Sequence, residues 1–403
     1  MEEDRSRAPA DGWRVADCEV VTNPAAAPLD GGRDAASAIL GDAALDEARA
    51  AISRWPGYRE TPLLALPSFA REAGVASVHY KDEGERFGLG SFKALGGAYA
   101  VQRLLAAHAG APGSVTVCCA TDGNHGRSVA WGAGMFGCRA VIFVHETVSE
   151  GRVTAIERYG ATVVRTAGNY DDSVREAQRV ADEKGWFVVS DTSWPGYTEV
   201  PTSVMQGYEL MALEAHERLA APPTHVFLQT GVGGMAAAVS ACLTRRAGGA
   251  RPRFVLADPE HAACWVESFR AGAPTAIGGG LDTMMAGLAC GEVSLLAWDI
   301  LRTLADAAVS VPDARAAALM RRLAEPADGE PPIVAGESAV AGLAALLAIA
   351  PDPASRARLG LDERSRVLVF GTESDTDPEL YAAIIGRDAD AVRAAGRPAG
   401  RYS

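Results

Sequence analysis

A lysine close to the start of a predicted helix is the first residue that could do covalent chemistry. Lys93 follows Ser91-Phe92 in the glycine-rich segment Phe87–Gly97, and the helix continues through Ala98–Ala106. The N-terminus of a helix is electropositive, so it disfavours an ammonium group and is expected to lower the pKa of Lys93. A neutral amine is the form that makes a Schiff base. Lys93 is therefore a candidate covalent residue; the alternative is a solvated lysine in a surface turn.

A second candidate site is Thr121–Gly126, which follows the predicted strand Val115–Ala120. Ligands of open α/β sheets gather at the carboxyl ends of parallel strands. The two glycines of this segment would let its backbone approach a flat ligand closely. Asn124 offers both donors and an acceptor, and Asp122 and His125 can exchange protons. The alternative is a tight turn in which Asp122 only caps the following helix.

The third candidate, Gln229–Met235, ends a predicted strand and opens a helix. Its glycines, Gly231, Gly233 and Gly234, can turn several backbone N–H groups toward one anion, and the helix dipole adds to the attraction. Phosphate is the ligand that fits. Because the segment lacks the lysine of a P-loop, a monophosphate carried by a cofactor fits better than a triphosphate. The alternative is a plain turn with small residues for packing.

Together, the three segments supply an amine, a loop that can contact a flat ring and a cradle for a phosphate. Pyridoxal 5'-phosphate (PLP) has these three requirements. Other common sites are not supported, since GxGxxG, GxxxxGK[ST], HExxH and GxSxG are all absent from the sequence. The seven cysteines form no CxxC pair and are odd in number, so neither a zinc site nor a disulfide framework is expected.

The elements that must position these residues alternate regularly along the chain. Short apolar strands separated by helical segments are typical of βαβ units in a parallel sheet, and they predict an α/β fold. A first block has expected strands at 115–120, 140–145, 162–166 and 187–191 and helices at 126–136, 150–159 and 170–184. A second block has strands at 226–229, 254–257 and 367–370 and helices at 235–245 and near 339–350. The turn-rich segment Trp194–Pro201 separates the blocks, so two α/β domains are expected.

The composition narrows the class of protein. The 403 residues carry 38 lysines and arginines against 51 aspartates and glutamates, a net charge of −13, which argues against nucleic acid as the main partner. The N-terminal residues lack the pattern of a signal peptide, and the longest apolar stretch, Ala339–Ala350, is too short to cross a bilayer. We expect a soluble, cytoplasmic protein that acts on a small molecule and contacts no membrane.

The candidate segments resemble those of the fold-type II PLP-dependent enzymes, the group of tryptophan synthase β and threonine dehydratase. In that group Ser-Phe-Lys supplies the Schiff-base lysine, an asparagine loop lies against the ring and a glycine loop holds the phosphate. Within the group, the chain is most similar to the diaminopropionate ammonia-lyase family. The closer matches cover most of the chain and lie at Phe87–Gly97, Thr121–Gly126, Asn169–Asp172, Asp191–Trp194, Gly196-Tyr197, Met205–Tyr208, Met285–Glu292, Gly336–Ser338 and Thr372–Pro378.

Three positions depart from the family pattern. Ser374 stands where a glycine is expected, Gly90-Ser91 precedes Phe92 where other small or polar residues are frequent, and Ala339–Ala341 replaces a run richer in glycine and proline. These departures bear on the shape of the pocket more than on the fold.

The resemblance implies a two-domain fold-type II enzyme with parallel-rich twisted sheets flanked by helices. Residues 1–90 and 203–403 would form the large PLP-binding domain and residues 91–202 the small α/β domain. The implied reaction is the α,β-elimination of ammonia from 2,3-diaminopropionate, which ends in pyruvate and ammonia. A homodimer is implied as well, since that is the usual state of the group.

The resemblance also implies a role for each candidate residue. Lys93 would carry PLP, and Asp122 and Asp191 would remove the Cα proton of the D and L isomers. An amine leaves only after it is protonated, so a nearby acid is required too, and Asp122 and Asp191 are the candidates for it. The remaining residues would bind the substrate (Thr121, His125), the phenolic oxygen of PLP (Asn124), its ring nitrogen (Thr372) or its phosphate (Gly231, Val232, Gly233, Gly234, Met235).

Three other functions stay open at this point. A serine or threonine dehydratase expels a hydroxyl group, for which a pocket aspartate matters less. A β-replacing synthase would trap aminoacrylate with a nucleophile. A non-catalytic PLP-binding module is disfavoured, because it has no need for Lys93, Asn124 and the glycine loop together.

Overall fold

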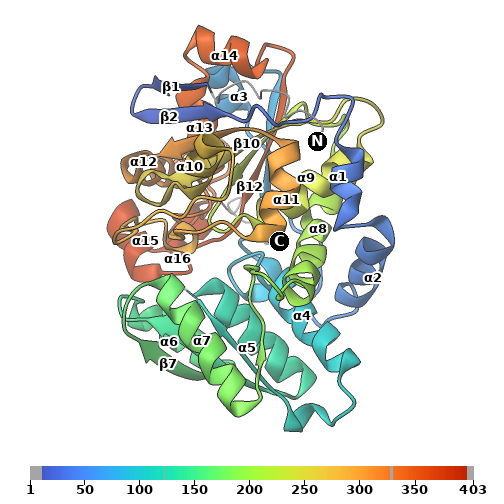
Figure 1. Cartoon of the computed structure of the whole chain (residues 1–403). Helices are drawn as coiled ribbons and strands as arrows, with labels where there is room; N and C mark the ends of the chain where they lie inside the picture. The colour runs from blue at the N-terminus through green and yellow to red at the C-terminus, as the bar shows by residue number, and fades with distance from the viewer. Residues whose placement is uncertain (1–10, 122, 327–329, 397–403) are drawn as a thin grey trace, which may run out of the picture.

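The strands of the described residues form two sheets, which lie in the upper and lower parts of Figure 1. The structure is a computed structural model and describes residues 11–121, 123–326 and 330–396. No helix within these ranges combines the length and apolar character needed to span a bilayer.

Eight of the described strands form the larger sheet. In order across the sheet they are β1 (Gly12–Val15), β2 (Cys18–Thr22), β11 (Ala305–Val311), β10 (Arg253–Pro259), β9 (His225–Gln229), β12 (Arg366–Gly371), β4 (Ser77–Asp82) and β3 (Leu63–Ala65). The five strands from β11 to β4 run parallel, and antiparallel strands flank them at both edges. Every residue of β9 is buried, as expected for a parallel strand covered by helices on both faces.

The smaller sheet has four described strands, all parallel. Their order is β7 (Thr162–Thr166), β6 (Arg139–His145), β5 (Thr116–Ala120) and β8 (Phe187–Val188). Cys118 and Cys119 of β5 are fully buried in this sheet, which is the core position that their apolar surroundings predict.

Helices cover both sheets. From the N-terminus they are α1 (Arg33–Ala38), α2 (Asp42–Ile52), α3 (Pro67–Ala73), α4 (Ala94–Ala107), α5 (Asn124–Phe136), α6 (Glu150–Glu157), α7 (Tyr170–Lys184), α8 (Glu199–Arg218), α9 (Gly234–Arg246), α10 (Cys264–Ala271), α11 (Leu295–Leu304), α12 (Asp313–Ala324), α13 (Ala341–Ile349), α14 (Pro353–Leu359), α15 (Pro378–Ile385) and α16 (Ala389–Ala395). Local sequence fixes some of the boundaries. Asn169, for example, caps α7 through a capping box with Asp172.

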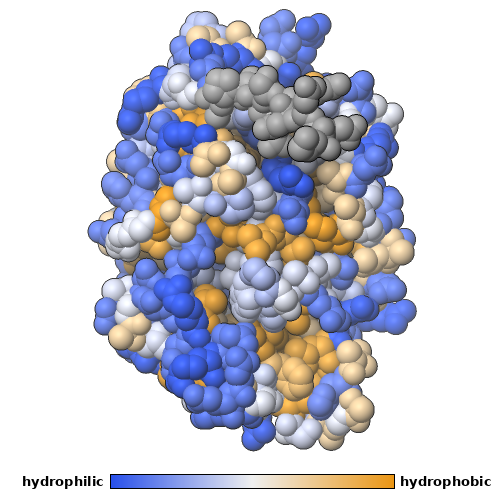
Figure 2. All heavy atoms as spheres, viewed as in Figure 1, coloured by the Kyte–Doolittle hydropathy of each residue, from blue (hydrophilic) through white to orange (hydrophobic). Residues whose placement is uncertain are grey.

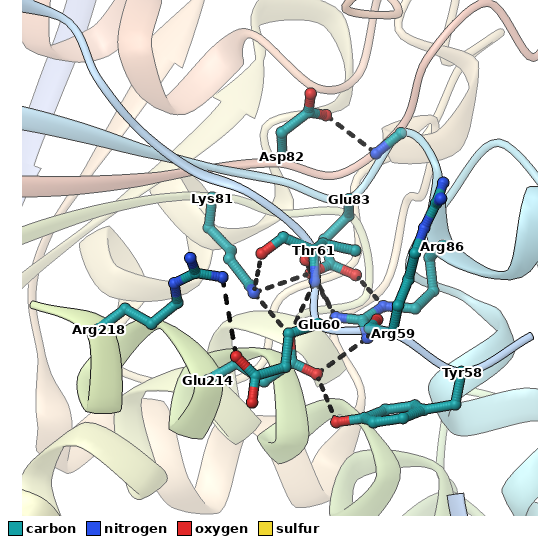
Figure 3. Close-up of polar contacts among 11 residues, drawn as sticks. Tyr58, Arg59, Glu60, Thr61, Lys81, Asp82, Glu83, Arg86, Glu214 and Arg218 are labelled. Carbon is teal, nitrogen blue, oxygen red and sulfur yellow. Dashed lines mark hydrogen bonds and ion pairs between the residues drawn. The ribbon is translucent and has the colours of Figure 1, made fainter. Parts of the chain in front are cut away.

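Two segments connect the sheets, and a cluster of buried charges joins them (Figure 3). The first segment leaves β4 toward α4, and the second enters α8. Arg86 of the first segment pairs with Glu83 (2.8 Å) and with Glu214 of α8 (2.7 Å), and Lys81 of β4 lies 2.6 Å from Glu214. None of these four side chains is more than 2% exposed, and their charges balance. The cluster holds the chain segment that leads to Lys93 against α8.

The structure confirms the predicted α/β class. The strand at 162–166 and the helix at 170–184 have the predicted bounds, whereas the other predicted elements differ by one to three residues at an end. The strand predicted at 187–191 is wrong at its end, since β8 stops at Val188. The phenol of Tyr197 replaces a strand partner there, because it accepts from the N–H of Ser190 (3.1 Å) and donates to the carbonyl of Val188 (2.8 Å).

The division into domains at residues 91 and 203 stays a prediction. All strands of the smaller sheet come from residues 116–188, which lie within the segment 91–202.

Candidate active site

One cavity collects the residues that the sequence singles out. It lies at the carboxyl ends of β5, β9 and β12, where parallel sheets bind ligands. Asp122 is outside the described residues. All the other predicted site residues line the cavity, while their roles stay predictions: Lys93, Thr121, Asn124, His125, Asp191, Gly231, Val232, Gly233, Gly234, Met235 and Thr372.

Lys93 directly precedes α4, and its side chain reaches the cavity beside Asp191. Its Nζ lies 2.5 Å from Asp191 Oδ2. Burial lowers the pKa of Lys93, but the Asp191 carboxylate outweighs burial and raises this pKa above its ordinary value. The prediction that the helix N-terminus lowers the pKa of Lys93 is therefore wrong. The full negative charge of Asp191, in contact with the amine, has a larger effect on this pKa than the partial charge of a helix end.

Asp191 is a buried carboxylate between two basic groups. Burial raises its pKa, yet the neighbouring His125 and Lys93 hold it well below the usual range. Burial lowers the pKa of His125, so its imidazole is neutral at pH 7. His125 Nε2 lies 2.7 Å from the carbonyl of Val189, which can only accept, so this nitrogen carries the proton. The other nitrogen, Nδ1, is then an acceptor 3.7 Å from Asp191 Oδ2.

The loop before α5 is held by its own side chains and by Glu373. Thr121 Oγ1 accepts from the N–H groups of Gly123 (2.9 Å) and Gly126 (3.0 Å). Asn124 donates through Nδ2 to a carboxylate oxygen of Glu373. Glu373 also accepts from the N–H of Ser338 (2.9 Å). The loop is thus fixed to the end of β12 across the cavity.

The glycine loop between β9 and α9 has the properties of an anion cradle. The carbonyl of Gly231 accepts from Trp265 Nε1 (3.0 Å) and that of Val232 from the N–H of Ser294 (2.9 Å). Among the described residues, none accepts a hydrogen bond from the backbone N–H groups of residues 231–235. Gly233 has a φ of +97°, and a Cβ there would lie 2.2 Å from Trp265 Cζ2. The loop therefore requires glycine and leaves its N–H groups for a ligand.

Thr372 directly follows β12 and lines the cavity. Its Oγ1 accepts from Gln229 Nε2 (2.8 Å), so the Thr372 hydroxyl keeps its own proton for another acceptor. An amine, a loop with amide donors, a free hydroxyl donor and an anion cradle therefore share one cavity. This set of donors fits PLP.

Sequence reasoning assigned no role to several other residues of the cavity wall, among them Arg152, Tyr170, Tyr208, Gln229 and Glu373. Tyr170 and Tyr208 belong to segments that resemble the family, and Glu373 follows Thr372 directly. Arg152, in contrast, belongs to no segment that the sequence analysis singled out. It pairs with Glu337 and with Asp377 (3.3 Å), both distant in sequence.

The departures from the family pattern do not line the cavity. Ser374 donates through Oγ to the carbonyl of Gly84 (3.2 Å), and its N–H donates to the carbonyl of Gly90 (2.8 Å). The serine thus ties the segment that precedes Lys93 to the end of β12. Ala339–Ala341 is buried in the core of the larger sheet.

The fold and the site define a PLP-dependent enzyme. A family model described as "Pyridoxal-phosphate dependent enzyme" matches residues 54–372, most of the chain. Solved structures with less sequence identity share the fold, such as a threonine deaminase from Solanum lycopersicum with 19% identity and a TM-score of 0.72.

Curated relatives narrow the class further. A diaminopropionate ammonia-lyase from Escherichia coli is 41% identical over 356 residues, which cover 83% of this chain and 89% of the relative. One from Salmonella typhimurium is 38% identical and covers 89% of this chain and 96% of the relative. The crystal structure of the E. coli enzyme with an aminoacrylate-PLP azomethine reaction intermediate has a TM-score of 0.83 and 37% identity, with coverage of 93% and 98%. The chain therefore belongs to the diaminopropionate ammonia-lyase family of PLP-dependent enzymes.

Proposed function

We propose that this chain catalyses the α,β-elimination of ammonia from 2,3-diaminopropionate, so that pyruvate and ammonia are released. One observation carries the proposal: in a cavity that fits PLP, the Lys93 amine contacts the Asp191 carboxylate at 2.5 Å. A covalent anchor and a proton acceptor thus share the cavity. Relatives that the chain matches over nearly their whole length are named for this substrate.

PLP supplies an electron sink for negative charge at the substrate Cα. Lys93 would hold the cofactor covalently, and the N–H groups of residues 231–235 would hold its phosphate. Asn124 would contact its phenolic oxygen. Thr372 would donate to its ring nitrogen, since the Thr372 oxygen already accepts from Gln229.

The side chains around the substrate would move the protons. Asp191 has a lowered pKa and is therefore a carboxylate at pH 7, ready to take the Cα proton of the L isomer. Asp122 would do the same for the D isomer. The leaving amine needs a proton, and Lys93 Nζ, whose pKa is raised, can supply one in the same cavity. Thr121 and His125 would contact the substrate.

We also propose a cytoplasmic homodimer with a large domain of residues 1–90 and 203–403 and a small domain of residues 91–202. All seven cysteines are free thiols, which is typical of a reducing compartment. Figure 2 shows apolar side chains gathered across the middle and the lower half of one face, a surface that a second copy could cover. Light scattering of the purified protein tests the dimer, and a monomeric mass would contradict it.

Steady-state kinetics test the substrate. Release of the 2-oxo acid is measured with D- and L-diaminopropionate, serine and threonine, each with and without an added thiol nucleophile. The product is pyruvate from diaminopropionate and serine and 2-oxobutyrate from threonine. We expect the highest kcat/KM with diaminopropionate and no effect of the thiol. A higher kcat/KM with serine or threonine would make the enzyme a dehydratase, and loss of pyruvate in favour of a thiol adduct would make it a synthase. A protein that stays colourless with PLP would contradict catalysis altogether.

A further inference from the structure

Tyr208 is a cavity residue that the proposed mechanism does not use. It lies on α8, is 1% exposed and lines the cavity with Lys93 and Asp191. Its ring centre is 4.7 Å from that of Phe92 and 5.9 Å from Lys93 Nζ. The phenol thus stands beside the amine that we propose as the cofactor anchor.

Close packing of two helices fixes the Tyr208 ring. A Cβ at Gly96 of α4 would lie 2.4 Å from Tyr208 Cε1, and a Cβ at Gly207 of α8 would lie 1.9 Å from the carbonyl oxygen of Leu95. The two glycines therefore let α4 and α8 approach closely. As a result, the phenol has little freedom to turn away from the start of α4, where Lys93 lies.

The Tyr208 hydroxyl is buried, and no described residue hydrogen-bonds to it. A buried hydroxyl without a partner is unfavourable, so its place in a cavity wall calls for a partner in the functional state. Burial raises the pKa of Tyr208, and the phenol is therefore neutral and able both to donate and to accept.

We propose that Tyr208 is a positioning residue for Lys93: its phenol oxygen accepts an N–H of the Lys93 amine and orients the lone pair of that amine. In the structure the amine bonds to Asp191. When Asp191 accepts a proton it loses its charge, and the Tyr208 phenol then offers the amine a neutral acceptor on the side of α8. The inference rests on the proposed roles of Lys93 and Asp191 and does not depend on which amino acid is the substrate.

The test follows covalent attachment of PLP to cofactor-free Asp191→Asn protein through its visible absorbance between pH 6 and pH 10. Once the Asp191 carboxylate is removed, burial is the largest influence on the pKa of Lys93 and lowers it, which brings the pH profile toward this range. The variants are made in this Asp191→Asn background. No amino acid is present. The variant is Tyr208→Phe, which keeps the ring and removes the hydroxyl. The matched control is Tyr381→Phe. Tyr381 of α15 is also 1% exposed, and its hydroxyl has no hydrogen-bond partner among the described residues, but Tyr381 does not line the cavity.

We expect two changes in Tyr208→Phe. The rate constant at the high-pH plateau falls about tenfold, because the amine is no longer oriented. The midpoint of the pH profile moves to lower pH, because the ammonium form loses a hydrogen-bond acceptor. Tyr381→Phe should match the Asp191→Asn protein in both. A second variant, Tyr208→Met, fills the space without a hydroxyl and should repeat the slower plateau.

If Tyr208→Phe leaves the plateau and midpoint of the Asp191→Asn protein unchanged, the inference is overturned, and the same holds if Tyr208→Met leaves the plateau unchanged. Neither result touches the substrate assignment, which the attachment assay does not measure. Failure of the wild-type protein to bind PLP would instead contradict the proposed function.

Discussion

Lys93 Nζ lies 2.5 Å from Asp191 Oδ2, although the two residues are 98 positions apart in the chain. The contact joins the start of α4 to the segment that follows β8, and it brings an amine and a carboxylate to one cavity wall. It also sets their ionisation, since each charge stabilises the other.

Asp191→Asn should remove the proton acceptor and keep the shape of the site. We expect kcat for L-diaminopropionate to fall by about 10²–10⁴-fold, the usual contribution of a general base, while the visible absorbance of bound PLP persists. Stopped assays of pyruvate with each isomer measure this effect. Asp122→Asn is the companion variant for the D isomer. If both variants keep full turnover of both isomers, the two-base account is wrong.

Gly233→Ala should weaken PLP binding. The added Cβ would meet Trp265 at 2.2 Å, and the backbone would have to hold alanine at a φ of +97°. We expect at least a tenfold rise in the Kd for PLP, equivalent to about 1.4 kcal/mol, measured by titration of cofactor-free protein. Gly248→Ala is the control, because a Cβ there has no atom within 4 Å and φ is not positive. Equal affinity of the two variants would contradict the role of the glycine loop.

The sequence predicted the alternating elements and the three loops, since both depend on local patterns. Strand periodicity placed β5, β6 and β9 to within about a residue, and glycines marked the loop before α9. Strand periodicity did not predict β4, because a lysine such as Lys81 is typical of a surface position. Lys81 is buried because it pairs in the core with Glu214, 133 positions away. The prediction of a lowered pKa for Lys93 was wrong for the same reason. The direction of this pKa shift depends on Asp191, which is distant in the sequence. Arg152 and Tyr208 reach the cavity only through tertiary packing.

Glu214→Gln should strongly destabilise the fold. It removes one charge of a buried, balanced cluster and leaves Arg86 and Lys81 short of a partner. We expect a loss of about 3–5 kcal/mol, measured by urea denaturation. Glu217→Gln, one turn further along α8, breaks an exposed pair with Arg49 and should change stability by less than about 1 kcal/mol. Similar losses in the two variants would contradict the importance of the buried cluster.

Asp82 should make the fold less stable as the pH rises. Burial raises the pKa of this carboxyl to about 6. Between its unfolded pKa, about 4, and pH 6, the folded state holds a proton that the unfolded state has lost. Stability from this group is therefore complete below pH 4 and is lost as the pH rises through 6, by about 1.4 kcal/mol between pH 5 and pH 8.

Asp82→Asn does not titrate and should lack this part of the pH dependence. It keeps an oxygen that can accept from the N–H of Gly84 (3.0 Å in the wild type). Urea denaturation of both proteins at pH 5 and pH 8 makes the comparison. Parallel pH profiles for the wild type and the variant would show that Asp82 has an ordinary pKa.

The ratio of ammonia to pyruvate tests the central claim most directly. Elimination from 2,3-diaminopropionate, followed by hydrolysis of aminoacrylate, releases both nitrogens of the substrate. The PLP-loaded enzyme should therefore produce two ammonia molecules for each pyruvate from diaminopropionate, and Lys93→Ala should produce neither. One ammonia without pyruvate, or equal product formation by Lys93→Ala, would contradict the assignment of this cavity to PLP-dependent ammonia elimination.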